Sequence, residues 1–381
     1  MEIKQSIPFN KPYLTGKESH YIYQAVLSGK ISGDGIFTKR VHEFFENKYG
    51  FKKCLLTTSC TDALELAAIL LDIKEGDEVI MPSYTFVSTA NAFVLRGAKI
   101  VFADSYFNNP NIDVTQIEAL ITSKTKAIVP VHYAGVACDM DSILALAKKY
   151  DLFVVEDAAQ AIDSYYQGKP LGSLGHLAAF SFHETKNIIS GEGGMLVIND
   201  ERFIKRAEII REKGTNRSAF FRGEVDKYGW VDVGSSFLPS DIIAAFLFAQ
   251  LENINEIQAK RKVLWNRYHK NLEPLTAQGK IKFPEIPLYA ESNAHISCII
   301  CKDVEERQQL IITLKEAGVM AVFHYLSLHT STYYLNRHDG RTLPYTDYFS
   351  DCLLRLPLYF ELTEEDVDYI CSIIHKFYNN N

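Results

Sequence analysis

Short apolar runs alternate with helical patterns through the first half of the chain. Runs of strand length cover residues 54–58, 78–82, 99–104, 127–133 and 152–157, and apolar residues recur at helical spacing in 61–71, 89–97 and 140–150. Near-continuous apolar strands are typical of a parallel sheet covered by helices on both faces. Two further runs, at 177–183 and 193–200, extend the sheet. The alternation therefore predicts an α/β fold with a mostly parallel sheet.

The pattern changes after about residue 241. A long helical stretch covers residues 241–272, and it is followed by a strand at 293–303, a helix at 305–318 and a terminal helix that begins near 363. Because this part mixes few strands with long helices, we expect a large domain over residues 1–250 and a smaller α+β domain over residues 251–381.

Composition and charge narrow the class of protein. The chain has 381 residues, 47% hydrophobic, with 40 basic and 47 acidic residues and a net charge of -7. Without a Lys/Arg block, nucleic acid is not an expected partner. The N-terminal residues lack the apolar core of a signal peptide, and no stretch reaches the roughly 20 apolar residues of a membrane span. We expect a cytoplasmic protein.

The cysteines do not suggest a metal site. Their number, seven, is odd, and they are scattered through apolar strings. Cys298 and Cys301 have a metal-like spacing, but an offset of three in a strand puts the two sulfurs on opposite faces. We therefore expect reduced cysteines and no metal.

Three strand ends carry candidate chemistry, because open α/β sheets bind ligands beyond the carboxyl ends of their strands. After the strand at 54–58 come Ser59, Cys60 and Thr61, which open a helix. Free N–H groups, hydroxyls and the positive end of the helix dipole suit a phosphate there. An ordinary Ser/Thr helix cap is the alternative.

The other two strand ends carry opposite charges. Asp157 closes the strand at 152–157, about 100 residues after the possible phosphate site, and Lys186 follows the strand at 177–183. Asp157 could simply cap the next turn, and Lys186 could be a solvated surface lysine. Together, however, a phosphate cradle, a carboxylate and a lysine are the three anchors of pyridoxal phosphate (PLP). The glycines of the turn 191–194 would let backbone pass close beside this lysine.

Longer motifs indicate a family. Segments 82–102, 131–141, 152–161, 180–187 and 211–223 closely resemble those of the DegT/DnrJ/EryC1/StrS sugar-nucleotide aminotransferases, and the resemblance extends from residues 7–16 to 354–366. It implies the PLP-dependent aspartate aminotransferase type of fold, known as fold type I. It also implies PLP as cofactor and a homodimer with shared active sites.

The resemblance implies a role for each matching residue. Lys186 would form the internal aldimine, Asp157 would pair with the pyridinium nitrogen, Gln160 would lie near the ring hydroxyl and Phe86 would stack on the ring. The phosphate would be held by Cys60, Thr61 and Ser181, beside Ser59. His183 would support the lysine rather than transfer protons.

Some positions depart from the family pattern. Ser236 stands where many members have an asparagine that reaches the phosphate from the neighbouring subunit. Asn216 or Arg217 would then take over that contact. His324, Tyr325 and His329 fall where the family brings the small domain against the active site.

Within the family the motifs are most similar to members that aminate C4 of a dTDP-linked keto sugar. The expected reaction moves the amino group of L-glutamate to dTDP-4-dehydro-6-deoxy-D-glucose, giving dTDP-4-amino-4,6-dideoxy-D-galactose for surface polysaccharide. A 4-amino-glucose epimer, a 3-amino sugar and GDP-perosamine are alternative products. Lys186 argues against the related dehydratases, which have histidine there. A non-catalytic sensor is a further alternative, and an NAD enzyme is disfavoured because no G-x-G-x-x-G opens a helix.

Overall fold

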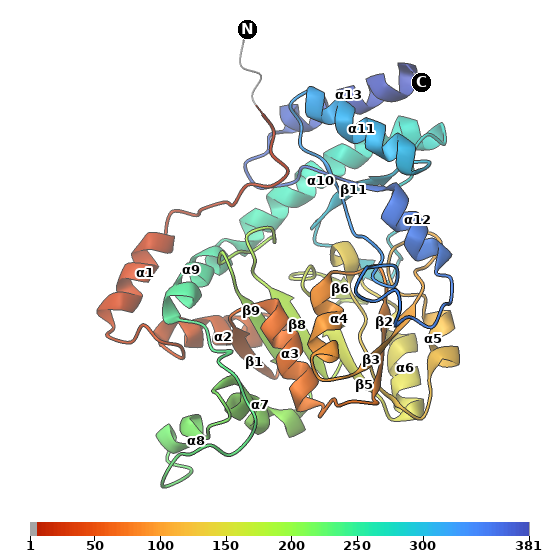
Figure 1. Cartoon of the computed structure of the whole chain (residues 1–381). Helices are drawn as coiled ribbons and strands as arrows, with labels where there is room; N and C mark the ends of the chain where they lie inside the picture. The colour runs from red at the N-terminus through yellow and green to blue at the C-terminus, as the bar shows by residue number, and fades with distance from the viewer. Residues whose placement is uncertain (1–5, 381) are drawn as a thin grey trace.

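The computed structural model describes residues 6–380, and its centre is a mostly parallel sheet of seven strands (Figure 1). Only β9 runs antiparallel to its neighbours within this sheet. In spatial order the strands are β1 (Lys53–Thr57), β9 (Gly194–Ile198), β8 (Leu177–Ser181), β5 (Phe153–Asp157), β4 (Thr125–Ile128), β2 (Glu78–Pro82) and β3 (Lys99–Ala103). All seven strands predicted from the apolar runs are confirmed, and so is the α/β fold.

Helices cover both faces of this sheet, as its apolar strands require. Leu55 and Leu56 are neighbours on β1, yet they pack into separate clusters because side chains alternate across a strand. One face packs against α3 (Cys60–Leu70), α4 (Val87–Val94) and α7 (Ile204–Arg211). The other face packs against α2 (Ile36–Tyr49), α5 (Val114–Leu120), α6 (Met140–Tyr150) and α9 (Asp241–Glu252).

A second, smaller sheet lies beside long C-terminal helices. Its order is β11 (Ser297–Ile300), β13 (Leu353–Leu356) and β12 (Val322–Phe323), all antiparallel. It shares a core with α10 (Ile254–Ala277), α11 (Val304–Glu316) and α13 (Glu364–Asn380). These elements confirm the predicted strand and two of the predicted helices.

The predicted helix at 241–272 is two helices, because α9 ends at Glu252 and α10 begins at Ile254. Helix α10 packs against both parts: Ile257 lies in the core of the large sheet and Leu264 in the core of the small one. The N-terminal segment also joins the smaller part, since Ile7 pairs with Val319. The division at residue 250 stays a prediction.

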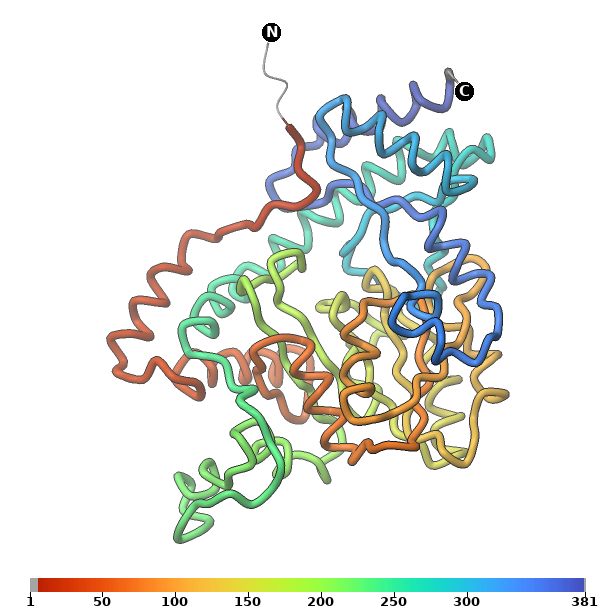
Figure 2. The backbone as a smooth tube through the Cα atoms, in the orientation of Figure 1, coloured from red at the N-terminus to blue at the C-terminus, as the bar shows by residue number. Residues whose placement is uncertain are grey.

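Periodicity did not predict α2, α5, α7, β12 and β13, described above, and it did not predict the remaining elements. They are α1 (Glu18–Leu27), α8 (Arg217–Phe221), α12 (Pro344–Cys352), two short 3₁₀ turns (Tyr133–Gly135 and Glu201–Phe203) and a small sheet of β10 (Ala290–Glu291), β6 (Tyr165–Tyr166) and β7 (Lys169–Pro170). Of these, α8 projects from the body of the molecule together with the chain on either side of it, shown in green at the lower left of Figure 2.

The two cysteines with metal-like spacing point to different cores. Cys298 packs with Tyr84 and Phe349, whereas Cys301 packs with residues of α10, α11 and α13. The opposite-face argument from the strand geometry is therefore confirmed. Among residues 6–380, no helix is long and apolar enough to cross a membrane.

Candidate active site

A cavity of about 590 Å³ opens where the carboxyl ends of the parallel strands meet the small sheet. It brings together eleven of the residues expected from the sequence: Ser59, Cys60, Thr61, Phe86, Asp157, Gln160, Ser181, His183, Lys186, His324 and Tyr325. This convergence follows from the topology, because β1, β2, β5 and β8 all end at the same edge of the sheet.

One end of the cavity is the N-terminus of α3. Ser59 caps this helix: its Oγ accepts from the Asp62 N–H at 3.0 Å. The N–H groups of Cys60 and Thr61 lie in the first turn and have no acceptor within the helix. Gly194 on β9 passes so close that a Cβ there would lie 2.2 Å from the Ser59 carbonyl carbon. Gly194 thus makes room beside the helix terminus. The rest of the turn runs beside the loop that carries Lys186, since Gly191 accepts from the Glu184 N–H at 2.9 Å.

Asp157 lies at the end of β5 with its carboxylate held from two sides. Thr89 Oγ1 donates to Oδ2 at 2.7 Å, and the Ala159 N–H donates to Oδ1 at 3.1 Å. The Thr85 hydroxyl lies 2.8 Å from that of Thr89 and extends the chain of hydrogen bonds. Burial raises the pKa of Asp157, while these donors and the charge of Lys186 oppose the shift. The carboxylate is therefore fixed in place and its charge calls for a cation.

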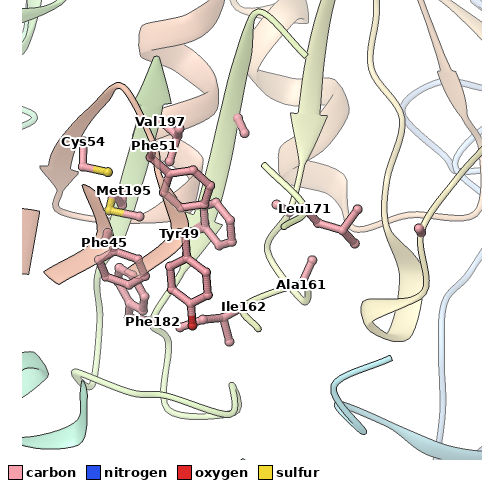
Figure 3. Packing of buried hydrophobic residues seen from close by; sticks show 14 of the residues in the cluster. Phe45, Tyr49, Phe51, Cys54, Ala161, Ile162, Leu171, Phe182, Met195 and Val197 are labelled. Atoms are coloured by element: carbon pink, nitrogen blue, oxygen red, sulfur yellow. The ribbon is translucent and has the colours of Figure 1, made fainter. Parts of the chain in front are cut away.

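Lys186 sits on a turn anchored by its aromatic neighbour. Phe182 follows β8 and packs against Phe45 with ring centroids 5.7 Å apart (Figure 3). The chain then turns, and the Lys186 N–H donates to the His183 carbonyl oxygen at 2.9 Å. Burial, reinforced by the charge of Arg355, lowers the pKa of Lys186 from 10.5 to about 8. A larger fraction of this amine is therefore unprotonated near neutral pH than for a solvated lysine.

His183 belongs to the same turn. Its Nδ1 accepts from the Thr185 N–H at 3.2 Å and lies 2.9 Å from the Thr185 hydroxyl. Its Nε2 lies 3.7 Å from a carboxylate oxygen of Glu192. Since these contacts occupy both ring nitrogens, they suit the supporting role expected for His183.

The small sheet supplies the opposite wall. Gln160 accepts from the Ala134 N–H at 2.6 Å and donates to the Tyr325 hydroxyl at 3.1 Å. His324 Nδ1 lies 3.1 Å from the Tyr133 hydroxyl. Phe86, 55% exposed, forms the rim of this wall with its ring centroid 6.1 Å from that of Tyr325. The wall is a connected set of aromatic and polar side chains.

Four expected residues lie elsewhere in the described chain. The His329 ring is buried, with Nδ1 2.8 Å from the Ser83 hydroxyl, so it joins the turn after β2 to the small sheet. Asn216 accepts from the Gly229 N–H, Arg217 pairs with Glu212, and Ser236 is exposed. Asn216 or Arg217 was expected to contact the phosphate of a neighbouring subunit in place of Ser236, and this stays a prediction.

The cavity also contains side chains that the sequence reading missed: Thr85, Ser88, Thr89, Thr185, Glu192, His295 and Arg355. The sequence contained a signal for two of these residues. Thr89 lies at the start of α4, in the hydroxyl-rich stretch 83–89 that follows the strand end at Pro82. Arg355 is a lone charge in the apolar run 353–358. His295 had none, because a histidine in an apolar string is more often a packed core residue.

The residues of the cavity fit PLP. A helix N-terminus and the hydroxyls of Thr61 and Ser181 would hold its phosphate. Asp157 would hold its ring nitrogen, and Lys186 would hold its aldehyde carbon. Asp157 and Lys186 also interact within the cavity: the charge of Lys186 lowers the pKa of Asp157, and the charge of Asp157 raises the pKa of Lys186.

Comparisons with known proteins agree with this site. The chain is 32% identical over 98% of its length to protein MJ1066 of Methanocaldococcus jannaschii, 98% of which is covered. Its structure is similar to Spr1654 of Streptococcus pneumoniae, described as a sugar aminotransferase (TM-score 0.91, 28% identity, 99% of this chain and 98% of that one). Structures of Spr1654 in PLP and PMP forms match as well.

A further neighbour is the aminotransferase TlmJ of Streptoalloteichus hindustanus (TM-score 0.90, 27% identity, 99% of this chain and 100% of that one). The sequence profile of one family matches residues 12–375. The chain therefore belongs to the DegT/DnrJ/EryC1/StrS aminotransferase family, and it is a PLP-dependent sugar aminotransferase.

Proposed function

We propose that the protein transfers the amino group of L-glutamate to C4 of dTDP-4-dehydro-6-deoxy-D-glucose, which makes it a dTDP-4-amino-4,6-dideoxygalactose transaminase acting in surface polysaccharide synthesis. The observation that carries the proposal is the pair of Lys186 and Asp157 on the wall of one cavity. The motifs around that pair are most similar to those of C4 aminotransferases, which supports the choice of sugar.

PLP, when bound, supplies an electrophilic carbon and a ring that accepts electrons from a breaking C–H bond. Asp157 would hold the ring nitrogen of bound PLP in its protonated form, because a buried carboxylate stabilises a neighbouring cation. Thr89 and the Ala159 N–H hold that carboxylate in one orientation.

Lys186 acts as the base and acid of the reaction. With PLP bound, the free Nζ of Lys186 would accept a proton from the substrate carbon and donate it again. The pKa of about 8 keeps both protonation states accessible near neutral pH. The turn anchored by Phe182 keeps the amine within the cavity during this exchange.

A second copy of the chain completes the site in this proposal. The segment around Asn216 and Arg217 exposes Phe221 and Trp230, which are 69% and 85% exposed. Large apolar side chains exposed in this way are typical of surfaces that bind a partner. Light scattering should therefore give the mass of a dimer, and a monomer that retains PLP and turnover would contradict this part.

The test of the reaction is to supply PLP, L-glutamate and a panel of dTDP-, UDP- and GDP-linked keto sugars, and then to identify the product. We expect the dTDP-4-keto sugar to be aminated fastest. The NMR coupling constant between H3 and H4 of the product decides the stereochemistry, because an axial amine gives a small value and an equatorial amine a large one. A large coupling constant, or amination at C3, would contradict the proposal.

A further inference from the structure

Arg355 is a guanidinium in the active-site cavity without a protein partner. It lies on β13 and lines the cavity with Lys186, His295, His324 and Tyr325. Its Nε is buried and has no hydrogen-bond partner within residues 6–380, and no carboxylate in that range pairs with it. Its contact is with the Phe9 ring, whose centroid lies 4.7 Å from the guanidinium carbon. Arg355 is half-buried, and a partly desolvated guanidinium without a carboxylate partner favours binding of an anion from outside the chain.

Buried arginines show what a structural role looks like in this fold. Arg261 lies nearby and donates to three backbone carbonyl oxygens, those of Ala294, His295 and Leu358. Arg211 pairs with Asp34 at 2.5 Å. The Nε of Arg211 and that of Arg307 are unpaired as well, but both arginines donate to the chain through their other N–H groups. Arg355 is distinct because none of its N–H groups has a partner among residues 6–380.

The position of Arg355 separates it from the phosphate end of the cavity. Its charge affects the pKa values of Lys186, His324 and Tyr325, which form the lysine side and the small-sheet wall. Arg355 also lines a small adjoining cavity with Phe9, Asn10, Thr185 and His295, and no residue of α3 contributes to that cavity. The active-site cavity therefore has two positive regions, one at the start of α3 and one at Arg355.

We propose that Arg355 binds the α-carboxylate of the amino donor, which rests on the transaminase function proposed above. In an α-amino acid the carboxylate is bonded directly to the carbon that carries the amine, so its site must lie beside Lys186. In the sugar substrate the diphosphate is attached at C1, across the ring from C4. An anion site next to the lysine therefore fits the amino acid.

The surroundings suit a carboxylate. A planar guanidinium can donate two parallel hydrogen bonds to one carboxylate, and the Phe9 ring restricts its plane. Burial lowers the pKa values of His295 and His324 well below the ordinary range, so these neighbours are neutral. Arg355 is then the permanent cation on this side of the cavity.

A binding experiment tests the site without turnover. Glutarate carries the carboxylates of the donor but no amine, and its affinity for the PLP-loaded protein can be measured by calorimetry. Arg355→Met should weaken glutarate binding at least about 30-fold, because one partner of a charged pair is removed. Arg355→Lys should retain part of the affinity. Arg96→Met, which removes an exposed guanidinium, should leave it unchanged.

Measuring the two half-reactions separately distinguishes an effect of Arg355 on the amino donor from an effect on the sugar. In Arg355→Met, the apparent affinity for L-glutamate in the first half-reaction should fall about 30-fold, while amination of the keto sugar by the PMP form should change by less than about threefold. An unchanged PLP absorbance spectrum will show that the variant is folded and loaded.

Two results would overturn the proposal: glutarate affinity that is unchanged in Arg355→Met, or an equal loss in both half-reactions. Failure of the proposed sugar reaction has a different signature. If the wild type binds glutarate through Arg355 but does not aminate the dTDP-4-keto sugar, the sugar assignment is wrong and the carboxylate site stands.

Discussion

The loop that carries Lys186 and the segment that carries Asn216 and Arg217 differ in how one chain supports them. Phe182, at the start of the loop, is fully buried in the core of the large sheet (Figure 3). The other segment projects from the body, and its Trp230 is 85% exposed (Figure 2). One chain thus supports the lysine side of the site through its own core, whereas the projecting segment is the part for which we propose a partner subunit.

The largest effect on turnover should come from a substitution in the loop that carries Lys186. Lys186→Ala should lower turnover by at least about 10⁴-fold, because no other amine lines the cavity formed by the described residues. The visible absorbance of covalently bound PLP should disappear as well. Lys169→Ala, which removes an exposed lysine, serves as the control. Turnover or absorbance retained in the Lys186 variant would refute the assignment.

Asp157→Asn should lower kcat by about 10²- to 10⁴-fold, since the neutral amide cannot keep the ring nitrogen protonated. The side chain keeps its size, so the fold and the PLP content should be retained. Asp151→Asn, at the other end of the same strand and exposed, should have no effect. Steady-state kinetics on the loaded variants check this, and equal kcat values for both would contradict the role of Asp157.

A pH experiment probes the burial of the lysine in the cofactor-free protein. The pKa of Lys186 is lowered from 10.5 to about 8, so between these values the unfolded chain binds more protons than the folded chain. Stability from this group therefore rises with pH across that window, and the cost of burying the ammonium is fully present below pH 8.

The full difference between the pKa values of 10.5 and about 8 corresponds to about 3 kcal/mol of unfolding free energy. Urea unfolding at pH 7.5 and 10.5 should give a rise in unfolding free energy that is larger in the wild type than in Lys186→Met by about this amount. Lys169→Met should behave as the wild type. Equal rises in all three proteins would mean that Lys186 is solvated before PLP binds.

The smallest effect should come from a substitution in the projecting segment that carries Asn216 and Arg217. Arg217→Ala removes an exposed ion pair with Glu212, so the free energy of unfolding should change by less than about 0.5 kcal/mol. PLP should nevertheless dissociate about tenfold faster if Arg217 reaches the phosphate of a partner. Arg202→Ala, another exposed ion-paired arginine, is the control. Identical PLP dissociation in both variants would remove Arg217 from the site.

Much of the fold was predictable because its strands are apolar runs of regular spacing. The same pattern located Ser59, Asp157 and Lys186, since residues that follow parallel strands meet at one edge. The missed helices are α1, α2, α5, α7, α8 and α12, and three of them, α5, α7 and α8, have 7, 8 and 5 residues, which is too short to establish a helical period. The break between α9 and α10 at Asn253 was missed because no proline or glycine marks it in the sequence.

The sequence by itself determined the alternation of strands and helices in the α/β part, the residues at the strand ends and, through its motifs, the family, whereas the spatial order of the strands came from the structure. Only the tertiary structure decided which distant side chains join them: Thr89 on Asp157, Gly194 against the start of α3, and Arg355 beside Lys186. The physical reason is that hydrogen bonding and desolvation depend on contacts between separate elements. Such contacts arise from sheet topology and core packing, and they leave no local pattern along the chain.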